Sequence, residues 1–290
     1  MDVVDYNMIK LLCRMTSFAL AISNFYSSPQ SFLAKTGLLV RVVRNRIRVT
    51  SATGLVEQLA MISALLQLSL SVEGSVVECG CYMGGATTNL SLVAKITGRK
   101  LYVFDSFEGL PEPSKHDRRH LAMNIVEYHS YTKGSWCGPL DIVKANVSQY
   151  GAPEVCTFIK GYFDTTLPSF SEPIGFAFCD VDLQDSLRIC IRYLWPLLSA
   201  GGLLFTHEAH HLEIASLFYD PAIWPDSAPG LVGAGSGLGL SPMPDGSFGS
   251  CIGYTIKSPS VMSESLELGK QERYRISFNR PSKELPGGVR

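Results

Sequence analysis

The sequence lacks several features that would assign it to a common class of protein. Lysine and arginine number 25 against 26 aspartates and glutamates, so no excess of charge favours a nucleic-acid partner. The apolar run at 55–72 is interrupted by Glu57, Gln58 and Gln67, which predicts a core helix and no membrane span. The N-terminus has no basic region before an apolar stretch, so we expect no secretory leader.

The eight cysteines contain no CxxC pair. Cys79 and Cys81 flank a glycine turn, too close in sequence for an easy disulfide, and we expect them to have no nearby cysteine or histidine partners for zinc. Free thiols in apolar segments are typical of a reducing compartment. The sequence therefore predicts a cytoplasmic protein.

What is present is a strand, a glycine turn and a helix around residue 80. Val76, Val77 and Cys79 form a short apolar run typical of a buried strand. Gly80 can adopt backbone angles that are closed to other residues, and Gly84 with its neighbour lets main chain approach a ligand closely. The N-terminus of the helix that follows offers unpaired N–H groups to an anion.

A second strand, 100–105, ends in Asp105, about 20 residues beyond these glycines. An acidic residue at this spacing can bind the two ribose hydroxyls of a nucleoside. The glycines do not follow the GxGxxG pattern, because Tyr82 stands two positions after Gly80. A bulky residue there disfavours a pyrophosphate. The pattern therefore favours a nucleoside that carries a smaller anion, such as the carboxylate of S-adenosylmethionine.

From residue 75 onward, short apolar runs alternate with helical patterns. The expected strands are 75–79, 100–105, 155–160, 174–180 and 202–207, and the expected helices are 85–97, 139–150 and 184–198. This alternation predicts an α/β protein with a mostly parallel, twisted sheet and helices on both faces. In such sheets ligands bind at the carboxyl ends of the strands.

The remaining segments suggest three parts. Residues 1–74 are expected to form a helical cover or lid, 75–258 the main domain and 259–290 a C-terminal extension. The polar connection 106–138 is expected to be an active-site lid, and the glycine-rich 230–240 a loop or hairpin. The arginine cluster at 41–48 is either a solvated face or a patch for an acidic partner or a membrane surface.

Five segments closely resemble the macrocin O-methyltransferase family. They are VVECGCYMGG (76–85), VFDSFEGLP (103–111), KGYFDTTLP (160–168), FCDVDL (178–183) and LLSAGG (197–202). The glycine turn also resembles that of the catechol O-methyltransferases. The resemblance implies a Rossmann-like class I methyltransferase fold and methyl transfer from S-adenosylmethionine to a sugar hydroxyl of a natural product, with a divalent metal. The acceptor would be a glycoside or another hydroxylated metabolite. Independently of the resemblance, the N-terminal segment 1–74 is a candidate contact for a homo-oligomer.

The same resemblance assigns the cofactor residues. It places the methionine part of the cofactor on Glu78, Gly80 and Tyr82, in the turn that Gly84 completes. The ribose is expected on Asp105 and its neighbour, Ser106.

For the metal, Asp180 matches an aspartate ligand of the family, and Asp182 matches a candidate base. The family then uses Asp-Asp after the fifth strand, whereas this sequence has His207 and Glu208. A nitrogen ligand shifts the preference from magnesium toward manganese or another transition ion. Alternatively, the two aspartates cap a helix that begins near Leu183, and His207-Glu208 is a polar loop.

Three functions follow from these residues. We expect an S-adenosylmethionine-dependent O-methyltransferase that works with magnesium or manganese. The first alternative is a relative that binds the cofactor but has lost metal-dependent catalysis, because His-Glu replaces Asp-Asp. The second is a nucleotide-binding oxidoreductase, which the missing GxGxxG disfavours.

Overall fold

The computed structural model describes residues 3–68, 70–117, 119–121, 124–128, 131–209, 211–225, 227–233 and 251–258. Residues 1–259 belong to one compact unit and 260–290 to a second. The expected C-terminal extension 259–290 and most of the glycine-rich stretch, 234–240, lie outside the described residues.

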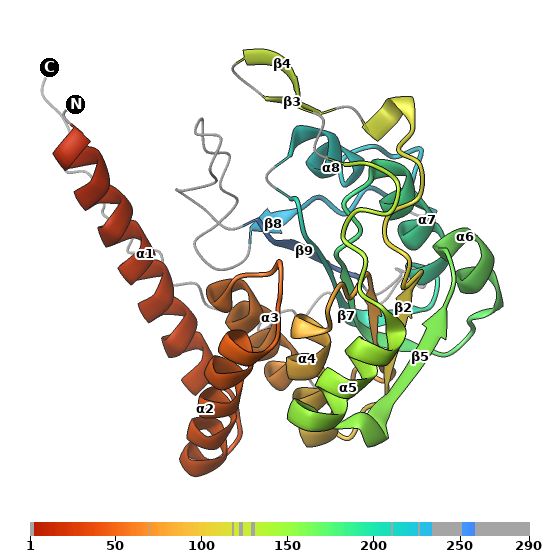
Figure 1. Cartoon of the computed structure of the whole chain (residues 1–290). Helices are drawn as coiled ribbons and strands as arrows, with labels where there is room; N and C mark the ends of the chain where they lie inside the picture. The colour runs from red at the N-terminus through yellow and green to blue at the C-terminus, as the bar shows by residue number, and fades with distance from the viewer. Residues whose placement is uncertain are drawn as a thin grey trace, which may run out of the picture. The chain divides into compact units, whose positions relative to one another are not determined.

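The centre of the first unit is a seven-stranded sheet in the order β5-β2-β1-β6-β7-β9-β8 (Figure 1). Its strands are β1 (Ser75–Cys79), β2 (Leu101–Asp105), β5 (Cys156–Lys160), β6 (Ile174–Cys179), β7 (Leu198–Thr206), β8 (Val232–Gly233) and β9 (Gly253–Ile256). The five strands β5, β2, β1, β6 and β7 run parallel to one another, while β9 is antiparallel to both β7 and β8. The mostly parallel α/β sheet expected from the sequence is confirmed.

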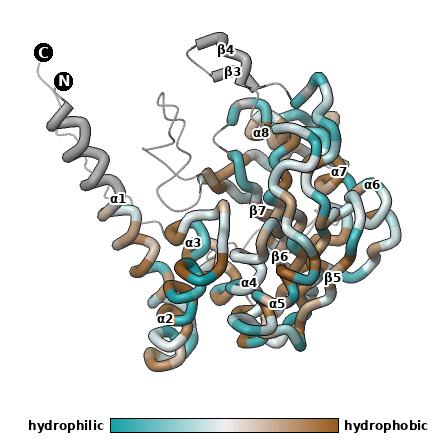
Figure 2. The backbone as a smooth tube through the Cα atoms, in the orientation of Figure 1, coloured by the Kyte–Doolittle hydropathy of each residue, from teal (hydrophilic) through white to brown (hydrophobic). Residues whose placement is uncertain are grey.

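Two apolar clusters hold the helices on opposite faces of the sheet. Val76 and Phe178 belong to one cluster, together with α3 (Leu55–Gln67) and α4 (Gly85–Ile96). Their strand neighbours Val77 and Cys179 belong to the other, together with α7 (Gln184–Leu194) and α8 (Leu212–Leu217). Successive strand residues point to opposite faces, so a strand buried on both sides reads as a continuous apolar run. Figure 2 shows such a hydrophobic segment, in brown, at β6.

Three helices precede the sheet, as expected for residues 1–74. They are α1 (Val3–Tyr26), α2 (Phe32–Arg48) and α3. The break between the first two falls at 27–31, where Ser31 caps α2 by accepting a hydrogen bond from the Ala34 N–H. Among the described helices, none combines the length and the apolar composition that a transmembrane segment needs.

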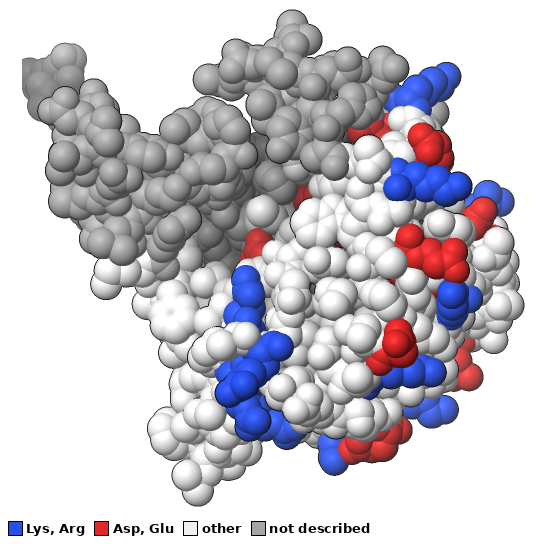
Figure 3. Space-filling view, in the orientation of Figure 1, with Lys and Arg blue, Asp and Glu red and all other residues white. Residues whose placement is uncertain are grey.

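The arginine cluster of α2 makes contacts with α5 (Leu140–Tyr150). Arg41 donates hydrogen bonds to the Tyr150 and Gly151 carbonyls, and the Arg44 guanidinium lies 5.9 Å from the centre of the Tyr150 ring. Cations at the C-terminus of a helix are favoured by its partial negative charge. These two arginines therefore support packing within the chain. Figure 3 shows acidic and basic side chains interspersed over much of one face, in keeping with the small net charge.

The structure differs from the sequence-based expectations in four places. The strand expected at 202–207 is longer at its start, because β7 runs from Leu198 to Thr206. The helix expected at 184–198 ends at Leu194 and β7 begins at Leu198, because Pro196 lies between them and cannot continue a helix. The connection 106–138 contains a short hairpin, β3 (Arg119–Leu121) with β4 (Asn124–Tyr128). The expectation that Cys79 has no cysteine neighbour is wrong, because the fold brings two distant cysteines to it.

Candidate functional site

A cavity of about 530 Å³ lies at the carboxyl edge of the parallel strands. Its wall includes a residue that ends or directly follows each of four strands: Gly80 after β1, Asp105 at the end of β2, Asp180 after β6 and His207 after β7. Small-molecule sites commonly have volumes of about 300–1,000 Å³. The expected location of the ligand site therefore coincides with a cavity of suitable size.

Most of the site residues predicted from the sequence line this cavity. They are Gly80, Tyr82, Asp105, Ser106, Asp180, Asp182, His207 and Glu208. The other two, Glu78 and Gly84, do not line it: Glu78 is fully buried, and Gly84 packs against the protein.

Asp105 fastens the glycine turn to the end of β2. Its Oδ2 accepts a 2.7 Å hydrogen bond from the Cys81 N–H, and its Oδ1 accepts one of 2.6 Å from the Phe107 N–H. Each carboxylate oxygen keeps a further lone pair for another donor. Asp105 therefore shapes the turn and can still accept hydrogen bonds from a ligand.

The two predicted glycines are needed for reasons other than approach to a ligand. Gly80 has φ +83°, and a Cβ there would lie 1.9 Å from the carbonyl oxygen of Asp180. Gly84 has φ +82°, and a Cβ there would lie 3.0 Å from the side chain of Val143 in α5. Both positions suit glycine because the backbone is left-handed there. The close approach that the sequence suggested is made by protein atoms.

Glu78 is an unpaired acid in the interior of the protein. It is fully buried in β1, and neither carboxylate oxygen has a hydrogen-bond partner. Its pKa is raised from 4.5 to about 8, mainly by burial and in part by the charges of Asp180 and Asp105, while the nearby Thr87 hydroxyl acts to lower it. Buried polar groups usually have partners. Glu78 is thus suited either to remain protonated or to receive a cationic group.

Ser106 is engaged within its own turn. Its hydroxyl donates a 2.7 Å hydrogen bond to the Gly109 carbonyl and accepts one of 3.1 Å from the Glu108 N–H. Phe107, between them, has φ +55°. The serine supports the loop that borders the cavity.

One imidazole, His207, is surrounded by three carboxylates. Its Nδ1 lies 3.4 Å from Oδ1 of Asp180 and contacts Oε1 of Glu208, and its Nε2 lies 3.7 Å from Oε2 of Glu57. The His207 side chain is only 11% exposed. Burial by itself lowers the pKa of His207, but the charges of Asp180 and Glu208 outweigh burial and raise the pKa well above its usual range.

The acids around this imidazole are shifted in opposite directions. The pKa of Asp180 is raised to about 7, mainly by burial and in part by the charges of Glu208 and Glu57, while the charge of His207 acts to lower it. Burial also acts to raise the pKa of Glu57, but His207 and the N–H groups of Gly54 and Cys251 lower it to about 2. Opposite shifts among neighbouring groups are common in functional sites.

The residues predicted to hold a metal fit such an ion. One ligand atom from each of Asp180, His207 and Glu208 lies within 4.8 Å of the others. The Thr53 hydroxyl donates a 3.3 Å hydrogen bond to Oδ2 of Asp180, which orients that carboxylate. Two carboxylates and an imidazole suit manganese, iron, cobalt or zinc.

Sequence reasoning missed the part that the N-terminal segment plays. Glu57 and Thr53 reach His207 and Asp180 from the start of α3, in a segment expected only to cover the sheet or act as a lid. Glu57 also accepts a 2.7 Å hydrogen bond from the Gly54 N–H, as a capping box requires. An acid three positions after a helix cap was the available signal, and it indicated only the helix start.

Strained backbone is concentrated at the cavity wall. Tyr82, Trp136, Asp182 and Glu208 all line the cavity, with φ values of +46°, +58°, +58° and +49°. Trp136 packs edge-on against Tyr82, with ring centres 5.3 Å apart. Such conformations persist where the surrounding structure imposes them, and they are common at functional sites.

The helix-cap alternative for Asp180 and Asp182 is wrong. The N-cap residue of α7 is Leu183, whose side chain makes no capping hydrogen bond, and the Asp185 N–H of the first turn donates to Oδ1 of Asp117. Asp180 and Asp182 lie instead on the cavity wall.

Comparisons with known proteins agree with this architecture. The sequence pattern of the macrocin O-methyltransferase (TylF) family matches residues 57–216. The Streptomyces olivaceus 8-demethyl-8-(2,3-dimethoxy-alpha-L-rhamnosyl)-tetracenomycin-C 4'-O-methyltransferase is 32% identical over 146 residues, which cover 49% of this chain and 55% of the relative. The chain thus spans about half the length of that relative.

A solved structure is similar over most of its length. The O-methyltransferase NovP aligns with a TM-score of 0.54 and 20% identity, over 86% of this chain and 99% of that chain. At this identity the likeness shows a shared fold, the class I methyltransferase fold expected from the sequence. The family pattern covers more than half of the chain, and this protein belongs to the macrocin O-methyltransferase family.

Proposed function

We propose that this protein transfers a methyl group from S-adenosylmethionine to a sugar hydroxyl of a glycoside, assisted by a divalent cation. One observation carries the proposal: the glycine turn with Asp105 and the set Asp180, His207 and Glu208 line the same cavity. The cofactor cradle and the acceptor-activating group of a methyltransferase must lie close together, because the methyl group passes directly from the sulfonium of the cofactor to the acceptor oxygen.

The cofactor residues have distinct roles in this proposal. Asp105 accepts hydrogen bonds from the ribose hydroxyls beside the turn that it fastens. Glu78, buried without a partner, provides the negative charge for the ammonium group of the methionine part. Gly80 and Tyr82 shape the turn, and Gly84 begins the helix behind it. Ser106 supports the ribose side of the cavity through its own turn.

The chemistry requires little activation of the donor, because the methyl group of a sulfonium is already reactive. The acceptor hydroxyl is a poor nucleophile until it loses its proton, and Asp182 on the cavity wall is the base that takes it. A divalent cation bound by Asp180, His207 and Glu208 would lower the pKa of that hydroxyl and orient it.

The acceptor class rests on similarity. The Streptomyces olivaceus relative is named for 4'-O-methylation of a rhamnosyl-tetracenomycin, and we propose a sugar hydroxyl of a glycoside for this chain as well. The cavity volume of about 530 Å³ leaves room for a sugar beside part of the cofactor.

A second candidate is a relative that binds the cofactor without metal-dependent catalysis. One observation favours it: Nδ1 of His207 contacts Oε1 of Glu208 and lies 3.4 Å from Oδ1 of Asp180. The imidazole nitrogen and the two carboxylate oxygens thus interact with one another, whereas a bound cation would need all three as ligands.

One experiment separates the two candidates. Methyl transfer from isotopically labelled S-adenosylmethionine to a panel of glycosides is measured after exhaustive chelation and after single additions of Mg²⁺, Mn²⁺, Co²⁺ or Zn²⁺. Activity that returns only with a cation supports the proposed function. Full activity after chelation rejects the metal, and cofactor binding without transfer to any glycoside supports the second candidate.

A further inference from the structure

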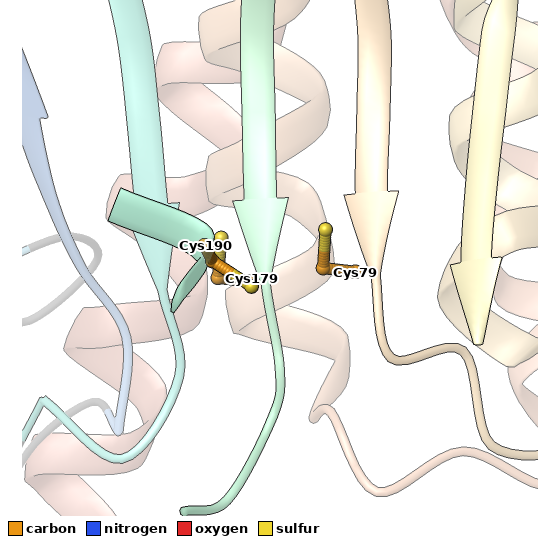
Figure 4. A group of neighbouring side chains, drawn as sticks. All are labelled: Cys79, Cys179 and Cys190. Carbon is orange, nitrogen blue, oxygen red and sulfur yellow. The ribbon is translucent and has the colours of Figure 1, made fainter. Parts of the chain in front are cut away.

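Three cysteines that are far apart in the sequence meet inside the protein. Cys79 ends β1, Cys179 ends β6 and Cys190 lies in α7. Their Sγ atoms all lie within 4.8 Å of one another, and all three residues are fully buried (Figure 4). Figure 4 shows the two strand cysteines on neighbouring strands, with Cys190 reaching them from the helix that covers this face of the sheet.

The backbone holds this cysteine cluster in place. Cys79 and Cys179 are register partners in the parallel pair β1–β6. The Asp180 N–H donates a 2.9 Å hydrogen bond to the Cys79 carbonyl, and the His207 N–H donates one of 2.9 Å to the Cys179 carbonyl. The cluster is therefore preformed, and it lies one residue behind the cavity wall in each of the two strands.

The surroundings of the cluster are apolar. All three cysteines are free thiols and belong to the core cluster that contains Leu187 and Ile191 of α7. Net charge in such an environment is penalised by the loss of hydration. An occupant that leaves the site neutral is therefore favoured over one that leaves a net charge.

The spacing suits three bonds to one central atom. Metal–thiolate bonds are about 2.3 Å long, which separates three sulfurs around one atom by at most about 4 Å. The sulfurs here lie within 4.8 Å of one another, so small side-chain movements suffice to reach that spacing. Thiolates are the ligands that soft ions prefer.

We propose that Cys79, Cys179 and Cys190 form a binding site for a trivalent thiophilic centre, with arsenite as its simplest probe. Arsenous acid, As(OH)₃, exchanges its three As–O bonds for three As–S bonds. Each thiol proton leaves with one hydroxyl group as water, and no atom is oxidised or reduced. The product carries no charge, whereas three thiolates on Zn²⁺ carry one negative charge. Entry requires a local opening of the helix that covers the cluster.

The test uses the reduced, full-length protein and sodium arsenite. Native mass spectrometry is expected to show one adduct with the mass of one arsenic atom less three hydrogens. Cys190→Ala is expected to weaken arsenite binding about tenfold or more, because the third bond is lost. The matched control is Cys137→Ala, at an exposed free cysteine outside the cluster, which should bind as the wild type does.

Other results would overturn the proposal. They are an adduct that has lost fewer than three hydrogens, equal binding by Cys190→Ala and wild type, or displacement of arsenite by equimolar Zn²⁺. Because Cys190→Ala could fail to fold, X-ray absorption at the arsenic edge is measured on the arsenite-treated wild type. Three sulfur neighbours around arsenic support the site, and oxygen neighbours contradict it.

Discussion

The Cys81 backbone N–H donates a 2.7 Å hydrogen bond to Oδ2 of Asp105, so the turn after β1 is tied to the end of β2. The same carboxylate holds the Phe107 N–H at the start of the next loop. One aspartate thus shapes two segments of the cavity wall before any ligand is bound. Its removal should affect the shape of the cradle as well as any contact with the ribose.

We predict that Asp105→Ala weakens binding of S-adenosylmethionine by about 1.5–3 kcal/mol, the range for hydrogen bonds to charged groups. Isothermal titration calorimetry with the cofactor measures this. Asp141→Ala, in the exposed first turn of α5, is the matched control and should leave affinity unchanged. Wild-type affinity in a folded Asp105→Ala protein would remove the ribose assignment.

We predict that Gly80→Ala destabilises the fold far more than Gly98→Ala. Both glycines have positive φ, but a Cβ on Gly80 would lie 1.9 Å from the Asp180 carbonyl, whereas a Cβ on Gly98 meets nothing within 4 Å. The left-handed backbone alone costs about 1–2 kcal/mol for alanine, and the clash adds to this cost only at Gly80. Urea unfolding measures both losses. Equal losses would show that the Asp180 carbonyl can move aside.

We predict that Glu78→Gln stabilises the cofactor-free protein more at pH 8 than at pH 5. The folded-state pKa of Glu78 is raised from 4.5 to about 8, so between these values the folded state binds more protons than the unfolded state. Stability contributed by this acid therefore falls as pH rises, by an amount on the order of 3 kcal/mol over the window. The glutamine does not titrate, so this fall disappears in the variant.

Urea unfolding of wild type and variant at several pH values tests the prediction. The difference between the two proteins isolates Glu78, because the other groups titrate in both. A constant difference from pH 5 to pH 8 would mean that Glu78 is hydrated or paired in the folded protein.

We predict that Asp180→Asn and His207→Ala lose metal-dependent methyl transfer and keep their affinity for the cofactor. The proposed metal ligands follow β6 and β7, whereas the proposed cofactor residues lie at the ends of β1 and β2. Because a nitrogen replaces one oxygen, manganese should support activity at least as well as magnesium. Calorimetry for the cofactor and turnover with each metal provide the two readouts. A parallel loss of cofactor binding would show that the two sets of residues act as one site.

We predict that Asp182→Asn lowers turnover while metal and cofactor still bind. The amide cannot accept the acceptor's proton at neutral pH, which removes general-base catalysis worth about 10²–10⁴-fold. Turnover and metal content are measured on the same preparation. Asp164→Asn, at another acid of the cavity wall, is the comparison and should reduce turnover much less. Equal losses of turnover in the two variants would mean that Asp182 is not the general base.

Local pattern was sufficient to predict most of the fold. The strands β1, β2, β5 and β6 were located to within one residue at each end. β1 and β6 are buried along their whole length, and such strands appear in the sequence as continuous apolar runs. The order of strands and helices then determined that the ends of these strands share one edge, and so it predicted the neighbourhood of Gly80, Asp105 and Asp180. The end of α7 was missed although Pro196 marked it.

The tertiary structure alone decided which other side chains meet there. Glu57 comes from α3, and its distance to His207 depends on how that helix packs against the sheet. Cys190 meets Cys79 and Cys179 only because α7 covers one face at this register. Periodicity tells which face of an element is buried, but not which residue of another element it touches. That choice is made by helix packing and strand register, which arise from contacts between residues far apart in the chain.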